Sequence, residues 1–309
     1  MYQHYGQPGT EPDDERPGHA VAILSMQESL PGIHIVDVNT DYQRLWGGSR
    51  EEWLGAPPVV AEQEAANQEI IAQLGNELNA LADGDFEGIN GREVARRHDG
   101  SRRHIEWRIT AMGSANSSAM TLVLTQRDVT EQMEKEAQLK RLATTDMLTG
   151  LVNRSQFDAV LKSEVSRQHR YARPLSLIML DLDYFKQIND SHGHDVGDQV
   201  LVALADLLKS NLRKADCCAR WGGEEFMLLA PETSLEQAVR LAEKIRGAIK
   251  HTDFPIQGSV TASFGVVEVH SQESVKSVMK RADDALYLAK EKGRDRVSTG
   301  GLLKSAKQA

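Results

Sequence analysis

Carboxylates gather around a glycine pair in the second half of the sequence. Asp181 and Asp183 end an apolar run, and Glu224 and Glu225 directly follow Gly222-Gly223. The end of a rigid strand can hold a carboxylate in place, but several carboxylates at one edge repel one another. A divalent cation relieves that repulsion, and Mg²⁺ prefers hard oxygen ligands and also binds substrate phosphates. The pattern predicts a metal site; the alternative is an acidic hairpin that faces solvent.

The spacing of apolar residues predicts the elements that position these groups. Residues 175–181 form a near-continuous apolar run, as expected for a strand buried on both faces. Gly222-Gly223 separates strand-like runs at 217–221 and 224–230, which is typical of a hairpin whose two turn residues both have φ > 0. The other predicted elements are a strand over 260–269, a helix capped by Ser155, and helices over 195–213, 234–250 and 273–292. The second half is therefore expected to be an α/β domain with a mostly antiparallel sheet.

The first half alternates short apolar runs with turn signals. Ile33–Val38 is predicted to be a strand, and Ser49 to begin a short helix through a capping box. A polar, alanine-rich helical stretch follows, and Asp99-Gly100 is a predicted turn. Ile105–Ile109 alternates apolar and charged residues, which indicates a half-buried antiparallel strand. Residues 120–124 are a further predicted strand.

A charged stretch joins the two halves. Glu131–Thr144 is predicted to be helical, and Val129, Met133 and Ala137 recur at four-residue spacing within and just before it. That spacing favours a helix that pairs with a second copy of itself between two domains. A plain solvated linker helix is the alternative.

Length, charge and cysteine content limit the possible functions. The chain has 309 residues and a formal net charge of −9, which is long enough for two domains of about 100–150 residues each. The negative charge disfavours binding to a nucleic acid polymer or to an anionic membrane. No apolar run reaches the ~20 residues that span a bilayer, so we expect a cytoplasmic protein without membrane insertion. The adjacent Cys217 and Cys218 suggest neither a disulfide framework nor a metal cluster.

Four motifs in order resemble one known family. Residues 220–226 read RWGGEEF, which matches the signature of GGDEF-family diguanylate cyclases in its GGEEF form. The segments DMLTGLVNR at 146–154 and DLDYFKQIND at 181–190, and a basic motif at 289–294, resemble further family motifs. The resemblance covers about residues 140–299. It implies a palm-like domain with a mostly antiparallel central sheet flanked by helices, so that the whole chain is expected to be a two-domain α+β or α/β protein.

The resemblance assigns catalytic roles to five residues. It implies that Asp181, the backbone carbonyl of Leu182 and Glu224 hold two Mg²⁺ or Mn²⁺ ions in each active site. Such a pair of ions can activate a 3′-hydroxyl and stabilise both the attacking and the leaving oxygen of an in-line displacement. Glu224 or Glu225 would accept the hydroxyl proton, and the sequence does not separate them. Lys186 would supply positive charge where pyrophosphate leaves.

The resemblance also assigns substrate contacts. Asn189 and Asp198 match the residues that read guanine in the family. A carboxylate can accept hydrogen bonds from both N1–H and N2–H of guanine, whereas N1 of adenine is an acceptor, so Asp198 favours GTP over ATP. Glycines in the hairpin let the backbone approach the nucleotide closely. The implied substrate contacts are Phe185, Asn189, His194, Asp198, Gly222, Gly223, Lys290 and Arg294.

A second motif lies upstream of the hairpin. Arg213-Lys214-Ala215-Asp216 has the RxxD form and the position of the family's inhibitory product site. A guanidinium can pair bidentately with a phosphate or with the edge of a guanine. Arg213 and Asp216 are therefore expected to bind cyclic di-GMP; the alternative is a surface ion pair.

The first domain resembles a PAS sensor. The resemblance rests on residues 35–39 and 49–55, the turn at 99–100, the strand that contains Trp107 and the exit segment 127–131. The ligand of this domain is unknown, and a ligand-free dimerisation module is the alternative. Cysteine is absent before residue 217, which excludes a flavin–cysteinyl photosensor.

We therefore expect five segments: a disordered tail (1–17), a PAS-like domain (18–130), a helical connector (131–145), a cyclase domain (146–299) and a second tail (300–309). The expected reaction joins two GTP molecules into cyclic di-GMP and releases two pyrophosphates, with a PAS-like domain and the product as regulators. Each domain binds one GTP, so turnover requires a homodimer. The rival functions are a catalytically silent receptor for GTP or cyclic di-GMP, and a cyclase whose product contains adenine.

Overall fold

The computed structural model describes residues 19–27, 30–61, 69, 88–112 and 119–300. The chain divides into two compact units, Met1–Ala137 and Gln138–Ala309. The predicted N-terminal tail and nearly all of the predicted alanine-rich helix and of the C-terminal tail lie outside the described residues. None of the described helices is long and apolar enough to cross a membrane.

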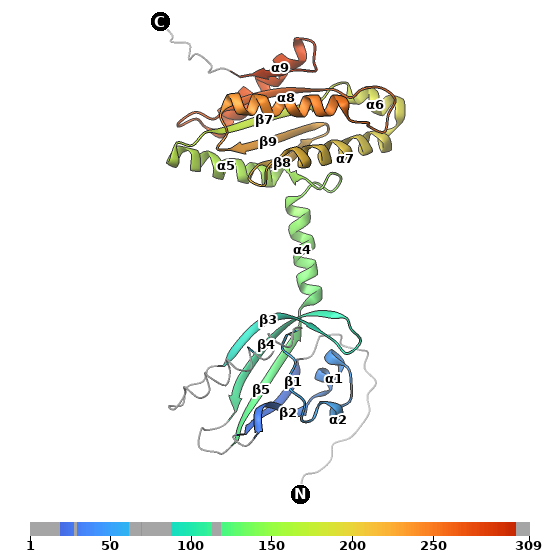
Figure 1. The fold of residues 1–309 in the computed structure, drawn as a ribbon, viewed down its shortest axis with the longest axis vertical. Coiled ribbons are helices and arrows are strands. Elements are labelled where there is room, and N and C mark those ends of the chain that lie inside the picture. The colour runs from blue at the N-terminus through green and yellow to red at the C-terminus, as the bar shows by residue number, and fades with distance from the viewer. Residues whose placement is uncertain (1–18, 28–29, 62–68, 70–87, 113–118, 301–309) are drawn as a thin grey trace, which may run out of the picture. The chain divides into compact units, whose positions relative to one another are not determined.

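In the first unit, five described strands form an antiparallel sheet in the order β2-β1-β5-β4-β3 (Figure 1). The strands are β1 (Ala20–Gln27), β2 (Leu30–Val38), β3 (Ile89–Arg96), β4 (Arg102–Met112) and β5 (Ala119–Asp128). Two short helices follow β2: α1 (Thr40–Trp46) and α2 (Arg50–Trp53). The predicted strands at 33–38, 105–109 and 120–124 are confirmed.

One face of this sheet forms the core of the unit. In β4, Ile105, Trp107 and Ile109 are buried, while Glu106 and Arg108 alternate with them on the other face. Leu24 and Leu124 join the same core from β1 and β5. The half-buried strand that the sequence predicts at 105–109 is therefore confirmed.

The turn and cap signals of the first unit are only partly confirmed. The turn at Asp99-Gly100 forms: Gly100 has φ +83°, and the Asp99 carboxylate accepts a hydrogen bond from the backbone of Ser101. Ser49 is the N-cap of α2, but its side chain makes no capping hydrogen bond with any described residue. The predicted capping box is thus wrong, because it requires the Ser49 side chain to accept a hydrogen bond from the backbone N–H of Glu52.

Helix α4 (Thr130–Thr144) confirms the predicted connector helix. It begins where the Asp128 carboxylate accepts a hydrogen bond from the backbone N–H of Thr130. Its apolar side chains Leu139 and Leu142 are 64% and 48% exposed in the single chain. Both interpretations of the connector, a paired helix and a solvated linker, remain open.

In the second unit, six described strands form a sheet in the order β11-β10-β7-β9-β8-β6. They are β6 (Val152–Asn153), β7 (Leu175–Leu182), β8 (Cys217–Gly222), β9 (Glu225–Pro231), β10 (Ala262–Glu268) and β11 (Val297–Thr299). The central pairings are antiparallel, and the outermost strands, β6 and β11, pair in parallel with their neighbours. Helices α5 (Arg154–Tyr171), α6 (Phe185–His192), α7 (His194–Asn211), α8 (Leu235–His251) and α9 (Val275–Glu291) flank the sheet.

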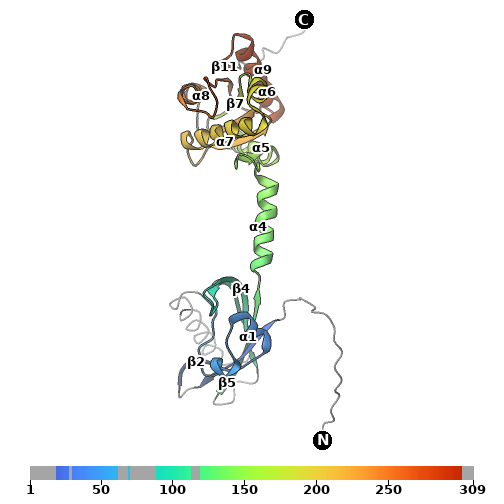
Figure 2. The same cartoon turned by 90° about the vertical axis from the view of Figure 1, so that its right-hand side faces the viewer.

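Both faces of this sheet are covered. Helices α5 and α9 pack on one face with Leu177 and Met179 of β7, whereas α7 and α8 pack on the other with Ile178 and Leu180. In Figure 2, α8 and α9 lie on opposite sides of β7. All eight residues of β7 are buried, as the apolar run at 175–181 predicts. The expected two-domain organisation, with a mostly antiparallel, helix-flanked sheet in the second unit, is confirmed.

The N-cap of α5 differs from the prediction, and α6 is a helix that the sequence analysis did not predict. Helix α5 is capped by Asn153 rather than by Ser155, because the Asn153 side chain accepts a hydrogen bond from the backbone of Gln156. Asn and Ser are similarly good caps, so the sequence alone does not choose between them. Helix α6 is separate from α7, since Gly193 has φ +86° and turns the chain between them.

The hairpin turn lies one residue later than predicted. Gly222 belongs to β8 and pairs with Glu225, so the turn consists of Gly223 and Glu224. A register shift between Arg220 and Gly222 moves the pairing by one residue. Of the two turn residues, Gly223 has a positive φ of 48° and Glu224 does not. The expectation that both turn residues are glycines with positive φ is therefore wrong.

Candidate active site

The carboxylates predicted to converge lie at one end of neighbouring strands. Asp181 of β7 is directly opposite Glu225 of β9. The backbone N–H of Leu182 donates a 3.4 Å hydrogen bond to the carbonyl of Glu224. The hairpin between β8 and β9 therefore places both glutamates beside the end of β7, and the proximity that the sequence predicts is present.

Asp181 is a nearly buried carboxylate. Its side chain is 9% exposed and forms an ion pair with Lys290 of α9, with 2.8 Å between the two atoms. Burial raises the pKa of Asp181 to about 6; Lys290 opposes this shift, and the nearby Glu224 and Glu225 add to it. The site therefore holds more negative charge than Lys290 alone neutralises.

The donor atoms at this edge suit a hard cation. Among the described residues, no group of three His, Cys, Asp or Glu side chains gathers as a metal site. The predicted set has two carboxylates, of Asp181 and Glu224, and the carbonyl of Leu182, so phosphate or water oxygens must complete the coordination. The ammonium of Lys290 already sits at a position that attracts positive charge. These oxygen donors suit a divalent cation.

Asp183 has a different role from Asp181. Its buried carboxylate accepts hydrogen bonds from the hydroxyls of Thr261 and Ser263, at 2.8 and 2.7 Å, and from the backbone N–H of Asp295 at 3.0 Å. These partners occupy both of its oxygens. Asp183 thus ties β10 and the segment after α9 to the end of β7, a role that the sequence analysis did not assign.

The segment that carries Arg294 is held from several sides. Arg294 has φ 58°, and its guanidinium lies 4.6 Å from the ring centre of Tyr184. The neighbouring Asp295 accepts hydrogen bonds from Arg246 and Lys250 of α8. Arg294 is thereby positioned beside Tyr184, two residues after the end of β7.

The predicted substrate contacts on α6 and α7 differ in exposure. Lys186, His194 and Asp198 are exposed, and Asn189 is partly buried. Phe185 is buried in the hydrophobic core. The roles of these residues, and those of Gly222, Gly223, Lys290 and Arg294, remain predictions.

Arg220 connects the hairpin to the motif at 146–154. Its Nε–H donates a 2.9 Å hydrogen bond to the carbonyl of Gly223, and its Nη1 lies 3.4 Å from the carboxylate of Asp146. Burial alone would raise the pKa of Asp146, but hydrogen bonds from Thr149 and the charge of Arg220 outweigh burial and lower it. The hairpin turn is therefore anchored to the segment that follows α4, which the sequence did not reveal.

The RxxD segment forms a tight turn beside a hollow of about 420 Å³. The Asp216 carboxylate accepts a 2.9 Å hydrogen bond from the backbone N–H of Arg213. The hollow also involves Arg240 and Lys244 of α8, which the sequence analysis missed although their four-residue spacing puts them on one face of a predicted helix. Its lining residues are Asn211, Arg213, Asp216, Thr233, Gln237, Arg240, Leu241 and Lys244.

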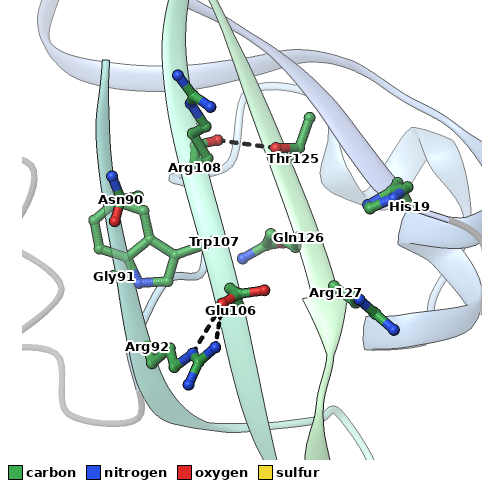
Figure 3. A pocket seen from close by; sticks show the side chains of 10 residues that line it. All are labelled: His19, Asn90, Gly91, Arg92, Glu106, Trp107, Arg108, Thr125, Gln126 and Arg127. Carbon is green, nitrogen blue, oxygen red and sulfur yellow. Dashed lines mark hydrogen bonds and ion pairs between the residues drawn. The ribbon is translucent and has the colours of Figure 1, made fainter. Parts of the chain in front are cut away.

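A separate hollow of about 570 Å³ lies on the sheet of the first unit (Figure 3). Arg92 of β3 pairs there with Glu106 of β4, and Arg127 of β5 borders the hollow as well. The buried Gln126 accepts a hydrogen bond from the indole of Trp46 and donates one to a backbone carbonyl. Gln126 is thus a structural residue, and the ligand of this unit stays unassigned.

Fold and site together define the class of protein. A half-covered antiparallel sheet is followed by a helix-flanked, mostly antiparallel domain whose strand ends collect carboxylates and cations. Residues 143–296 match the family model "Diguanylate cyclase, GGDEF domain", and residues 31–134 match the model "PAS fold". The chain belongs to the GGDEF family of diguanylate cyclases and carries a PAS domain in front of the GGDEF domain, as the sequence motifs predict.

Two characterised relatives illustrate the similarity. Diguanylate cyclase DgcM of Escherichia coli K12 is 42% identical over 199 residues, which are 64% of this chain and 48% of that protein. Diguanylate cyclase DgcP of Pseudomonas aeruginosa is 36% identical over 279 residues, which are 87% of this chain and 40% of that protein. The chain thus spans about half or less of the length of these relatives.

Solved structures support the same assignment. The coiled coil and GGDEF domain of DgcB from Caulobacter crescentus, solved in complex with c-di-GMP, has a TM-score of 0.53 and 34% identity, over 55% of this chain and 93% of that chain. The diguanylate cyclase SiaD from Pseudomonas aeruginosa, solved with its activator SiaC, has a TM-score of 0.50 and 41% identity, over 55% and 67% of the two chains.

Proposed function

We propose that this chain is a diguanylate cyclase that converts two GTP molecules into cyclic di-GMP and two pyrophosphates. The observation that carries the proposal is the meeting of Asp181, Glu224 and Glu225 at one sheet edge, with Lys290 in contact with Asp181. An active site needs this combination of carboxylates and cations to bring a polyphosphate and a hydroxyl together.

The proposed reaction is a double nucleotidyl transfer. The 3′-oxygen of each GTP forms a bond to the α-phosphorus of the other, and the bond from that phosphorus to the bridging oxygen of the β-phosphate breaks. Each 3′-hydroxyl loses one proton, and each transfer releases one pyrophosphate. Bound Mg²⁺ would lower the pKa of the attacking hydroxyl and neutralise charge on the transferring phosphate.

The chain's own residues supply the rest of the site. Asp181, Glu224 and the carbonyl of Leu182 would hold the ions, and Glu224 or Glu225 would accept the proton. Lys186, Lys290 and Arg294 would offset the charge of the departing pyrophosphate. When the ions bind, Lys290 must therefore give up part of its contact with Asp181 in order to contact the substrate.

Base selection is proposed to depend on two side chains of α6 and α7. Asp198 is exposed, so its carboxylate is free to approach the N1–H and N2–H donors of guanine. Asn189 belongs to α6, and it lies near the start of α7, the helix that carries Asp198. Replacing GTP with ATP would place the acceptor N1 of adenine against a carboxylate, so GTP is the proposed substrate.

The proposed catalytic unit is a homodimer. One GGDEF domain holds one GTP, and both 3′-hydroxyls can react only when two domains face each other. The exposed Leu139 and Leu142 of α4 support this proposal, because pairing would bury them.

Product is proposed to inhibit the enzyme at a separate site. The hollow beside Arg213 and Asp216 also carries Arg240 and Lys244, so cationic groups from two elements border it. Such groups suit the phosphates and guanine edges of cyclic di-GMP. The hollow involves none of the residues proposed to hold the ions.

Incubation of the purified full chain with GTP and Mg²⁺, followed by mass analysis of the products, tests the proposed function. We expect cyclic di-GMP, and no dinucleotide when ATP replaces GTP. Binding of GTP or cyclic di-GMP without any product would instead identify the chain as a silent receptor.

A further inference from the structure

Asn189 is packed against a glycine without room for any side chain. A Cβ built on Gly197 would lie 1.9 Å from the Oδ1 atom of Asn189 and 3.0 Å from its Cγ. Contacts below 3.0 Å do not occur for real Cβ atoms, so an alanine at position 197 and the present Asn189 conformation exclude each other. The close approach joins the last turn of α6 to the first turn of α7.

The Asn189 side chain gains no hydrogen bond from this position. Its Oδ1 atom is buried and accepts none from any residue that the structure describes. An unpaired buried carbonyl is unfavourable, so local hydrogen bonding does not explain why Asn189 points toward Gly197. The absence of a Cβ at Gly197 is what leaves this conformation sterically possible.

Gly197 has no conformational reason of its own to be glycine. It lies within α7, its φ is not positive, and it is buried. Glycine inside a helix is less favourable than alanine. Because backbone geometry does not require glycine here, the requirement comes from the neighbouring Asn189 and, at 3.3 Å from the same Cβ position, from the ring of Phe185.

We propose that Gly197 is a positioning residue for base recognition: its missing side chain sets the orientation of Asn189 and thereby the enzyme's preference for guanine. The inference rests on the proposed function, in which Asn189 and Asp198 contact the base. Asp198 directly follows Gly197, so a displacement of the first turn of α7 would move both contacts. Asp181, Glu224 and Lys290 would remain where they are.

The test compares GTP with inosine triphosphate, which lacks only the exocyclic amine of guanine. Gly197→Ala should lower the preference for GTP over inosine triphosphate, measured as the ratio of the two kcat/KM values, by about tenfold, as expected when a hydrogen bond to the base is lost. A merely structural role would lower both kcat/KM values by the same factor and leave the ratio unchanged, which would overturn the inference.

A matched control is available in α8. Gly247 is also a helical glycine, but apart from its chain neighbours and the nearby backbone of its own helix, no heavy atom of the described residues lies within 4 Å of its Cβ position. Gly247→Ala should therefore leave the nucleotide preference unchanged and raise the thermal unfolding midpoint slightly. A loss of preference in Gly247→Ala equal to that in Gly197→Ala would overturn the specific role of Gly197.

A second background separates steric positioning from misfolding. In Asn189→Ala the clashing carboxamide is gone, so adding Gly197→Ala should change the nucleotide preference no further. Independent, additive losses in the double variant would contradict the inference. If the parent protein makes no cyclic di-GMP from GTP, the proposed function fails; if the parent is active and Gly197→Ala keeps the parental preference, only the inference on Gly197 fails.

Discussion

The two sheets of this protein bury their strands differently. In the first unit, β4 alternates buried Ile105 and Trp107 with Glu106, and the charged face carries exposed ion pairs such as Arg92–Glu106. In the second unit, every residue of β7 is buried between two layers of helices.

This difference supports the proposed location of the active site. A strand covered on both faces is held rigidly, so the side chains at its end have defined positions and are partly removed from water. Asp181 shows the result, because burial raises its pKa to about 6 although Lys290 is in contact with it. The first sheet instead offers a polar face at which charges are solvated and their interactions weak.

The largest expected effect is at the end of the doubly covered sheet. Glu224→Gln removes one negative charge from the proposed ion site but keeps the size of the side chain. We expect kcat for cyclic di-GMP synthesis to fall by at least about a hundredfold, the usual cost of losing an electrostatic group in an active site. Glu106→Gln, on the polar face of the first sheet, is the control for charge and should retain activity. Near-parental turnover by Glu224→Gln would refute the proposed ion site.

Buried and exposed ion pairs provide a second contrast between the units. Arg281 and Glu273 form a pair at 2.6 Å with side chains 2% and 9% exposed, whereas both members of Arg92–Glu106 are largely exposed. Glu273→Gln leaves a buried guanidinium without its counter-charge and should destabilise the second unit by about 3 kcal/mol. Glu106→Gln should cost at most about 1 kcal/mol. Chemical denaturation of both variants measures the difference, and equal effects would remove the contrast.

The pH dependence of the same pair has a definite sign. Burial alone would raise the pKa of Glu273, but hydrogen bonds from Arg281 and Ser277 outweigh burial and lower it below its usual 4.5. The pair therefore contributes its full stability above pH 4.5 and loses it as the pH falls through the lowered pKa. The difference between the parent and Glu273→Gln should shrink over that acidic range. A difference that stays constant down to pH 2 would exclude ionised Glu273 as its source.

A smaller effect is expected where a buried carboxylate positions a loop. Asp183→Asn replaces an acceptor that binds Thr261, Ser263 and the N–H of Asp295 with an amide that cannot accept all three hydrogen bonds. The segment with Arg294 should loosen, so KM for GTP should rise about tenfold with a smaller change in kcat. Asp283→Asn on the exposed side of α9 is the matched control. An unchanged KM would show that Asp183 does not position the triphosphate contacts.

The smallest effect on initial rate is expected at the RxxD hollow. Arg213→Ala should leave the initial rate unchanged and raise the cyclic di-GMP concentration that halves it by about fivefold, since one charged contact to product is lost. Lys214→Ala, a neighbour outside the hollow, should behave like the parent. Progress curves of the parent and the two variants measure this inhibition. If all three stop at the same cyclic di-GMP concentration, Arg213 has no role in product binding.

The sequence predicts those features that depend on local patterns. The apolar run of β7, the alternation in β4 and the helical periodicity of α7 and α8 each reflect burial along a single element, and the structure contains all of them. The glycine pair correctly predicts a hairpin, although the register shift after Arg220 moves the turn to Gly223 and Glu224.

Contacts between distant segments are not contained in such patterns. Apart from the family resemblance, the residue pattern does not distinguish Asp181 from Asp183. The packing of β10 and of the segment after α9 shows that the Asp183 carboxylate is fully hydrogen-bonded, whereas Asp181 pairs with Lys290. The same holds for Arg220, whose partner Asp146 is 74 residues away, and for Arg240 and Lys244, whose common hollow with Arg213 depends on the fold of two helices. Asn153 rather than Ser155 caps α5, because Asn153 is the residue with an extended backbone directly before the helix. The sequence does not show this choice, since both residue types suit an N-cap.

The central claim is that the strand ends of the second unit join two GTP molecules. The most direct measurement is the stoichiometry of the reaction, with GTP consumed, pyrophosphate released and cyclic di-GMP formed all quantified for the purified chain with Mg²⁺. The account predicts one pyrophosphate for each GTP consumed and one cyclic di-GMP for each pair of pyrophosphates. Release of inorganic phosphate in place of pyrophosphate, or consumption of GTP without cyclic di-GMP, would contradict it.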